Sequence, residues 1–189
     1  MKKVNRREFL NRSLAASMAS GFILSAQGSV SPTGPKKPAK DDISLAQWAL
    51  VSEIREGKWK NSDFPRIARE DFGINGIEFV STLFELPTFS YLKRLQRNAE
   101  KYKVTMILIM VDDEGETCDP NKETRIQTAI NHRKWVDIAK LLGCHSIRTN
   151  CRGPKNAPKD RALEWAADCY NRLLDYAAAA GIGILIENH

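Results

Sequence analysis

The sequence predicts an α/β fold, a (β/α)8 barrel of which about the first five βα units are present. Five short apolar segments alternate with four helical patterns and begin roughly 30 to 40 residues apart, as in a series of βαβ units. The third segment, residues 104–111, is apolar throughout, which is typical of a parallel strand covered on both faces. The loop after the first segment, residues 51–58, has a single glycine and no phosphate cradle, so a barrel is favoured over an open doubly wound sheet.

The first two predicted strands enclose one helix. Residues 43–50 form a short apolar run after an acidic pair, and this run predicts strand one. A polar cap followed by Pro65 predicts the start of a helix, and Gly73 predicts its end. Residues 76–80 then predict strand two.

Three further helices each lead into an apolar strand. Helical spacing of apolar residues predicts helices over residues 91–102, 119–142 and 163–177. Gly143 and Gly181 follow the second and third of these, where a glycine commonly ends a helix. The strands that come after these helices cover residues 104–111, 145–150 and 182–189.

The body of the chain is shorter than a complete barrel. A TIM barrel takes about 250 residues, more than residues 43–189 provide. We therefore expect an N-terminal fragment of a longer protein, incomplete at its C-terminus and inactive by itself. Strands one and five would be unpaired apolar edges, so the fragment expressed alone should be insoluble or form a homo-oligomer.

Residues 1–28 resemble a twin-arginine signal peptide. Arg6 and Arg7 precede an apolar pair, and the stretch that follows is too short and too rich in serine for a membrane-spanning helix. Residues 29–42 are rich in proline, glycine and lysine and predict a flexible linker. The resemblance implies that the twin-arginine export machinery carries the folded protein to the periplasm or the extracellular space, with membrane contact only during export.

The formal charge of +6 belongs to the leader. Residues 1–40 hold eight Lys and Arg residues and one acid, which leaves 21 basic and 22 acidic residues after position 40, a net charge of −1. A nucleic-acid-binding surface needs an excess of basic residues, which the body of the chain lacks. We therefore expect no nucleic-acid partner.

The four cysteines, at positions 118, 144, 151 and 169, have no CxxC spacing, which argues against a structural zinc site. Cys144 and Cys151 flank the fourth predicted strand, so about 20 Å separates them and no disulfide can join them. A bond between Cys118 and Cys151 stays open if both lie at one end of the sheet. Four reduced, packed thiols are favoured over that bond.

Polar side chains collect where the predicted strands end, and in a parallel barrel these ends form the site. The residues delivered there are Gln47, Trp48, Glu78, Asp112, Asp113, Glu114, Arg148, Asn150, Glu187, Asn188 and His189. Glu187 follows three large aliphatic residues, so its carboxylate needs a cation or a proton nearby. A hard divalent ion such as Mn²⁺ or Mg²⁺ would meet that need, with the imidazole of His189 as a further ligand or hydrogen-bond donor.

Six short segments carry a family resemblance: residues 44–48, 64–68, 73–78, 135–143, 147–150 and 186–189. Their order and spacing resemble the sugar phosphate isomerase/epimerase superfamily, the xylose-isomerase-like TIM barrels, over residues 43–189. The resemblance implies a divalent metal (Mn²⁺, Mg²⁺ or Zn²⁺) held by four side chains from the later strands. The first of these ligands corresponds to Glu187, and the other three would lie beyond His189.

The resemblance also implies a small-molecule sugar substrate. Arg148, Asn150 and His189 match positions that line the substrate pocket, and Trp48 and Glu78 complete the expected substrate-binding residues. Two of these have a structural alternative. Trp48 could plug the barrel instead of lining the pocket, and Glu78 could form an ion pair at the rim.

The implied reaction assigns a second role to Glu187. Moving a carbonyl along a sugar, or inverting the carbon beside it, removes a weakly acidic proton and leaves an enediolate, which a metal stabilises. We expect Glu187 to bind the metal and to transfer the proton, unless it caps the next helix or pairs with Arg148. Residues 112–116 are expected to form a solvated acidic loop rather than a calcium site, and His132 to be a core histidine.

A metal-dependent sugar or sugar phosphate isomerase or epimerase is the leading expectation, and two other functions stay open. One is an exported carbohydrate-binding barrel without catalytic activity. The other is a hydrolase like the abasic-site endonucleases, which share this barrel. A DNA-binding rim should be rich in Lys and Arg, so the near-neutral body argues against the endonuclease.

Overall fold

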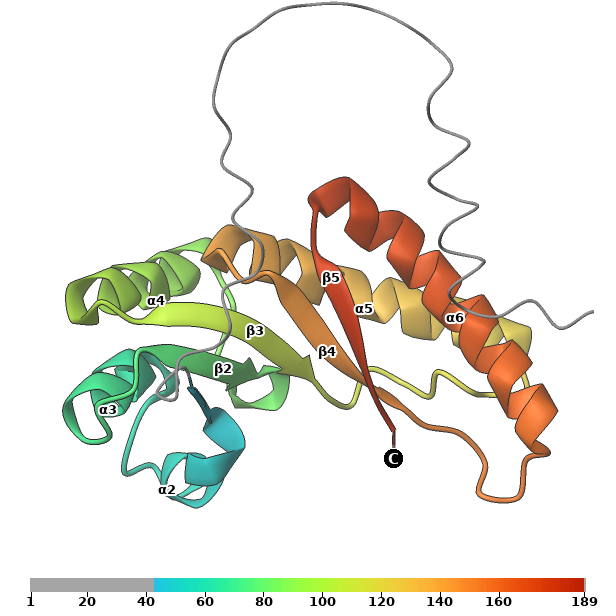
Figure 1. The fold of residues 1–189 in the computed structure, drawn as a ribbon, viewed down its shortest axis with the longest axis horizontal. Helices are drawn as coiled ribbons and strands as arrows, with labels where there is room; N and C mark the ends of the chain where they lie inside the picture. Colours follow the sequence, from blue (N-terminus) through green and yellow to red (C-terminus); the bar gives the residue numbers. More distant parts are fainter. Residues whose placement is uncertain (1–42, 189) are drawn as a thin grey trace, which may run out of the picture. The chain divides into compact units, whose positions relative to one another are not determined.

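The computed structural model describes residues 43–188, and a parallel five-stranded sheet runs through them (Figure 1). Its strands are β1 (Ser44–Ala46), β2 (Gly76–Val80), β3 (Thr105–Val111), β4 (Ser146–Cys151) and β5 (Gly183–Asn188). They lie in chain order, whereas a doubly wound sheet reverses its order at a switch point. The predicted barrel arrangement is therefore confirmed. The predicted signal peptide, the predicted linker and His189 lie outside the described residues.

Four longer helices connect the strands, and all four were predicted. They are α3 (Phe64–Glu70), α4 (Phe89–Tyr102), α5 (Lys122–Leu142) and α6 (Lys159–Ala180). Each packs against the next one in the chain, so the helices follow the sheet in the same order as its strands (Figure 1). Successive right-handed βαβ units place both the strands and the helices in chain order, as found here.

Short helices occupy segments that were predicted as strand or loop. They are the 3-10 helices η1 (Gln47–Leu50), η2 (Asn61–Asp63) and η3 (Ser81–Leu83), and the α-helix α2 (Val51–Arg55). The first strand is therefore shorter than the predicted residues 43–50. The amide side chain of Gln47 accepts a hydrogen bond from the backbone N–H of Val80 at 2.9 Å. The Gln47 side chain thus provides the hydrogen-bond acceptor for Val80 that the backbone of a longer β1 would otherwise provide.

Local signals explain where the long helices begin and end. Asn121 caps α5, because its side-chain oxygen accepts the backbone N–H groups of Glu123 at 2.8 Å and Thr124 at 3.2 Å. The helix ends at Gly143, whose φ of +81° is the left-handed conformation that glycine adopts without strain. The predicted start at Asp119 is early, because this carboxylate accepts the N–H of Asn121 in the turn before the helix.

The main core lies between the helices and the sheet. Phe79, Ile109 and Ile147, from three neighbouring strands, are fully buried against the helices. Aromatic rings continue the core from Phe79 through Phe84 to Trp135, with centroids 5.5 Å and 5.2 Å apart in edge-to-face geometry. This packing fixes the strands relative to the helices and so positions the residues at the strand ends.

The opposite face of the sheet carries the polar site. Strand residues alternate between faces, so the buried Ile77 and Phe79 face the helices while Glu78 faces the other way. A bulge in β3 interrupts this alternation, because the register passes from Ile77 opposite Met106 to Glu78 opposite Leu108. After the bulge the regular pairing resumes, with Phe79 opposite Ile109 and Val80 opposite Met110.

The two edge strands of the described sheet are β1 and β5. On β5, Leu185 and Ile186 are 44% and 56% exposed. These are large apolar residues on a parallel strand, a type of strand that is normally covered. None of the helices within residues 43–188 is both long and apolar enough to cross a membrane.

Candidate active site at the strand ends

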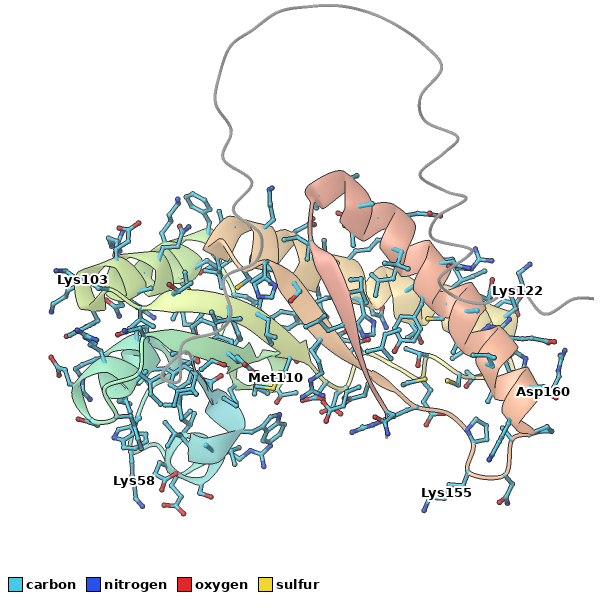
Figure 2. All side chains as sticks on the ribbon, viewed as in Figure 1. Lys58, Lys103, Met110, Lys122, Lys155 and Asp160 are labelled. Carbon is cyan, nitrogen blue, oxygen red and sulfur yellow. The ribbon has the colours of Figure 1, made fainter. Side chains whose placement is uncertain are left out.

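A polar cavity of about 320 Å³ opens at the carboxyl ends of the strands, and we call it the rim pocket. Figure 2 labels Met110, the penultimate residue of β3, which marks this end of the sheet. The residues that line the rim pocket are Trp48, Arg55, Thr82, Asp112, Asp113, Arg148, Arg152 and Glu187. Three cationic and three carboxylate side chains are among them, so the pocket is polar and close to neutral in charge.

A chain of hydrogen bonds joins β4 and β5 to the end of β3. In the sheet register Asn150 lies opposite Glu187, and Arg148 lies two residues before Asn150 on the same face. The guanidinium of Arg148 donates to the side-chain oxygen of Asn150 and forms an ion pair with Glu187. The amide nitrogen of Asn150 in turn donates to Asp112 Oδ1 at 2.5 Å. The structure therefore brings together four of the residues that were predicted at the strand ends.

The loop that presents Asp112 is tied to the neighbouring strand. The backbone N–H of Asp112 donates to the hydroxyl of Ser81 at 2.9 Å, and that hydroxyl donates back to the Asp112 carbonyl at 3.3 Å. Ser81 directly follows β2, so the bonds join the ends of two adjacent strands. They hold the carboxylate of Asp112 at the rim pocket.

Glu187 finds its counter-charge within the described part of the chain. The side chain of Arg148 is only 14% exposed and that of Glu187 is 47% exposed, so the pair sits at the mouth of the pocket. This is the pairing that the sequence analysis named as the alternative to metal binding. Within residues 43–188, no group of three or more His, Cys, Asp or Glu side chains is placed to hold a metal ion. These residues therefore do not form a metal site by themselves.

Trp48 lies on the wall of the rim pocket. Its ring also packs against the buried residues Val80, Leu108 and Met110 on this face of the sheet. The guanidinium of Arg55 lies over the ring, 5.6 Å from its centroid, in cation–π geometry. Trp48 thus serves both as pocket wall and as cover for the apolar residues below.

Two residues expected at the rim lie elsewhere. Glu78 does not line the rim pocket, because β2 continues for two residues beyond it to Val80. Its carboxylate accepts a hydrogen bond from the hydroxyl of Ser44 at 2.5 Å and forms no ion pair with any residue in the range 43–188. Gln47 is fully buried, and its amide bonds to Asn61 as well as to the backbone of Val80. These bonds give Gln47 a place in the core.

A second cavity, of about 310 Å³, lies beside the first under the loop between β3 and α5. His132 lines it and is otherwise buried, with its Nδ1–H donating to the carbonyl of Thr128 at 2.7 Å. Burial lowers the pKa of His132 below its usual 6.5, so the ring is neutral at pH 7. Glu114 from the same acidic loop is held by the indole N–H of Trp135 at 2.6 Å and by Lys134 at 2.8 Å.

Part of this loop differs from the solvated loop that was predicted. Asp113 and Glu116 are exposed, as expected, but Glu114 is held against α5. Asp113 has a φ of +63°, a left-handed conformation that Asp adopts more readily than most residues. The loop is therefore an ordered wall between the two cavities.

Asp112 and Asp113 were predicted to lie at the strand ends, but three other residues that line the rim pocket were not predicted: Arg55, Thr82 and Arg152. Arg152 directly follows β4, Thr82 lies in η3 just after β2, and Arg55 ends α2, the second short helix after β1. Position after a strand is therefore the signal that could have found them. That signal also marks many loop residues that never reach a pocket.

A family model described as "Xylose isomerase-like TIM barrel" matches residues 66–189 of this chain. Among solved structures, a sugar phosphate isomerase/epimerase from Parabacteroides distasonis ATCC 8503 is similar, with a TM-score of 0.60 and 17% identity over 88% of this chain and 56% of that one. D-psicose 3-epimerase from Clostridium cellulolyticum H10, solved with D-tagatose, is also similar, with a TM-score of 0.57 and 13% identity over 65% of this chain and 45% of that one.

The IolI protein, solved with a bound zinc atom, has a TM-score of 0.59 and 15% identity over 77% of this chain and 50% of that one. The chain thus spans about half the length of these structures. No curated protein matches it in sequence. The family match covers most of the body, and its fold agrees with the strand order found here. The chain therefore belongs to the xylose isomerase-like TIM barrel family.

Proposed function

We propose that the full-length protein is a metal-dependent isomerase or epimerase of a sugar or a sugar derivative. The observation that carries the proposal is the position of Glu187, at the carboxyl end of β5 and on the wall of a polar pocket. Proteins named as sugar isomerases and epimerases share this fold. The balanced charge of the rim pocket suits an uncharged polyhydroxyl ligand, whose hydroxyl groups can bond to both signs of charge.

Each of the main residues of the rim pocket has its own role in the proposed reaction. The Glu187 carboxylate removes the proton from the carbon next to the substrate carbonyl. In an isomerisation its acid form protonates the neighbouring carbon, and in an epimerisation a second acid outside residues 43–188 would protonate the same carbon from the opposite face. Arg148 orients that carboxylate through their ion pair. Asp112 and Asn150 bond to sugar hydroxyls, and the ring of Trp48 covers an apolar face of the sugar.

A divalent ion (Mn²⁺, Mg²⁺ or Zn²⁺) is part of this proposal. When bound, such an ion stabilises the negative charge that develops on two neighbouring substrate oxygens. Glu187 offers one hard oxygen ligand to it. The proposal places the remaining ligands outside residues 43–188, because the described residues do not make a metal site by themselves.

Export is part of the same proposal. Residues 1–28, read as a twin-arginine signal, would direct the folded protein through the twin-arginine machinery to the periplasm or beyond. Replacing Arg6 and Arg7 with lysine should then leave the protein in the cytoplasm, as measured by cell fractionation. Equal export of this variant would remove this part of the proposal.

Proton transfer tests the enzymatic part. The full-length protein is incubated with aldoses and ketoses in D₂O, and NMR follows isomer formation and deuterium at the carbon next to the carbonyl. We expect deuterium to enter at that carbon during turnover. Glu187→Gln should lower the rate by about 10²-fold to 10⁴-fold because it removes the base.

Glu100→Gln is the matched control. Glu100 is an exposed residue near the end of α4, which leads into the amino end of β3 rather than its carboxyl end, and it forms no described side-chain bond. This variant should keep the rate of the unmodified protein. Full turnover in Glu187→Gln, or turnover without deuterium uptake, would contradict the proposed role of Glu187.

One observation favours a second candidate, an exported carbohydrate-binding barrel without catalytic activity. Glu187 already has a cation, Arg148, as its partner. A protein of this second kind would bind sugars in calorimetry but show no turnover and no deuterium exchange. The same D₂O experiment therefore separates the two functions.

A further inference from the structure

Two cysteines meet at the rim of the sheet. Cys118 lies in the loop between β3 and α5, and Cys151 is the last residue of β4. Their sulfur atoms are 3.3 Å apart, and all four cysteines are free thiols in the structure. A disulfide bond is about 2.05 Å long, so the two sulfurs need to approach by only about 1.3 Å.

The backbone holds the two residues in this position. The N–H of Cys118 donates to the carbonyl of Arg152 at 2.8 Å, so the loop runs beside the end of β4 (Figure 1). The hydroxyl of Thr117 accepts the N–H of Arg152 and donates to the carbonyl of Asn150, both at 3.3 Å. These bonds pair the two segments on either side of the thiols.

The other two cysteines have no such partner among the described residues. Cys144 is buried in the core under the helices, and its thiol has a pKa raised by burial to about 12. The Cys169 thiol donates to the carbonyl of Arg125 at 3.6 Å. Both remain packed thiols, as the sequence analysis expected for all four.

The surroundings of the pair decide which sulfur reacts first. Both cysteines pack with Ala166 and Tyr170 of α6, but Cys118 is buried and Cys151 is partly exposed. Burial, and then the contact with Cys151, raises the pKa of Cys118 to about 11. An oxidant from solvent therefore meets Cys151 first.

We infer that Cys118 and Cys151 form a disulfide bond that locks the loop between β3 and α5 onto the end of β4. The oxidant is a disulfide, such as oxidised glutathione or the disulfide of a thiol oxidoreductase. The Cys151 thiolate attacks one sulfur of that disulfide and releases one thiol. Cys118 then loses its proton and attacks the Cys151 sulfur, forming the new bond and releasing the second thiol.

The step balances because two cysteine thiols lose two electrons and two protons, and the oxidant gains both as two free thiols. The bond would fix one wall of the rim pocket. Arg152, which lines the pocket, follows Cys151 directly, and Asp112 begins the loop that contains Cys118. The inference depends on this geometry alone and stands whether or not the protein is an isomerase.

The test oxidises the intact full-length protein. After reduction and removal of the reductant, the protein is incubated with oxidised glutathione, and the thiols are then titrated in denaturant. We expect the thiol count to fall by two, the intact mass to fall by two hydrogens, and a peptide map to join Cys118 to Cys151. Since the bond closes a loop across 33 positions, the melting temperature should rise by roughly 10 °C.

Two variants serve as controls. Cys151→Ser removes one thiol of the pair, and it does so at a partly exposed position, where the substitution disturbs the core least. The melting temperature of this variant should not change with oxidant. Cys144→Ala keeps the pair and should still lose two thiols on oxidation. An unchanged thiol count, glutathione adducts only, or a bond that joins Cys118 or Cys151 to any other cysteine would overturn the inference. The peptide map of the unmodified protein decides the matter even if a variant fails to fold.

Discussion

Gly153 lies directly against Cys118, just beyond the end of β4. A methyl group at position 153 would come within 2.6 Å of the Cys118 Cβ and 2.8 Å of its carbonyl oxygen. We predict that Gly153→Ala destabilises the protein by about 1 to 3 kcal/mol, because the crowded backbones must move apart. The same movement separates the two thiols, so disulfide formation should slow. Urea unfolding and the rate of thiol loss measure the two effects.

Gly183→Ala provides the comparison for this substitution. A methyl group at position 183 meets its nearest atom at 3.4 Å, an ordinary contact distance. This variant should form the Cys118–Cys151 bond at the rate of the unmodified protein. If Gly153→Ala is as stable and as quickly oxidised as Gly183→Ala, the close packing at Cys118 is not what holds the thiols together.

His132 makes folding sensitive to mild acid. Burial lowers its pKa in the folded state below 6.5, while the hydrogen bond to Thr128 and the charge of Glu114 act in the opposite direction. The unfolded chain therefore binds a proton first as the pH falls below 6.5, and stability is lost from there down to the folded-state pKa. For one proton this loss is at most about 1.4 kcal/mol per pH unit.

Replacing His132 with asparagine tests this. Urea unfolding at pH 8 and at pH 5.5 should show a larger drop in the free energy of unfolding for the unmodified protein than for His132→Asn. The variant lacks the titrating ring, so its pH dependence should be flatter. Equal pH dependence of the two proteins would show that other groups control acid sensitivity.

The residues of the rim pocket divide into those that sequence could find and those that it could not. Glu187, Arg148 and Asn150 stand at the ends of apolar runs, and a parallel sheet brings such ends together. Arg152 lies in a loop and Arg55 ends the five-residue helix α2, and neither segment has a periodic pattern that tells which side chain turns toward the pocket. Their positions depend on tertiary contacts, such as the stacking of Arg55 on Trp48.

At the scale of the element, α5 depends on one capping side chain. Asn121 satisfies two backbone N–H groups at the first turn of this long helix. We predict that Asn121→Ala lowers the free energy of unfolding by about 1 kcal/mol, measured in urea. Asn121→Asp should keep most of the stability because aspartate caps equally well. Equal loss in both variants would point to a role other than capping.

Hydrophobic periodicity predicted the long helices and the strands but not the short elements. A helix of five residues such as α2 is too short for its apolar spacing to differ from that of a loop. The early end of β1 has another cause, the side-chain bond from Gln47 to the backbone of β2. The bulge at Ile107 was also not predicted, because the continuous apolar run of β3 hides a change of face.

At the scale of the whole molecule, the exposed side of β5 predicts self-association. Leu185 and Ile186 lie on an edge strand whose backbone groups face outward, an arrangement that favours pairing with another chain. We predict that the chain of residues 1–189, expressed alone, forms oligomers or aggregates in gel filtration with light scattering. A soluble monomer with a sharp melting transition would contradict this prediction.

The proposed function depends on the carboxylate at the mouth of the sheet. Its most direct test is the metal content of the intact full-length protein, measured by elemental analysis for the unmodified protein and for Glu187→Gln and Glu100→Gln. We predict about one divalent ion per chain in the unmodified protein and in Glu100→Gln, and a clear loss of that ion in Glu187→Gln. Full metal occupancy in Glu187→Gln, or no metal in any of the three proteins, would contradict the account.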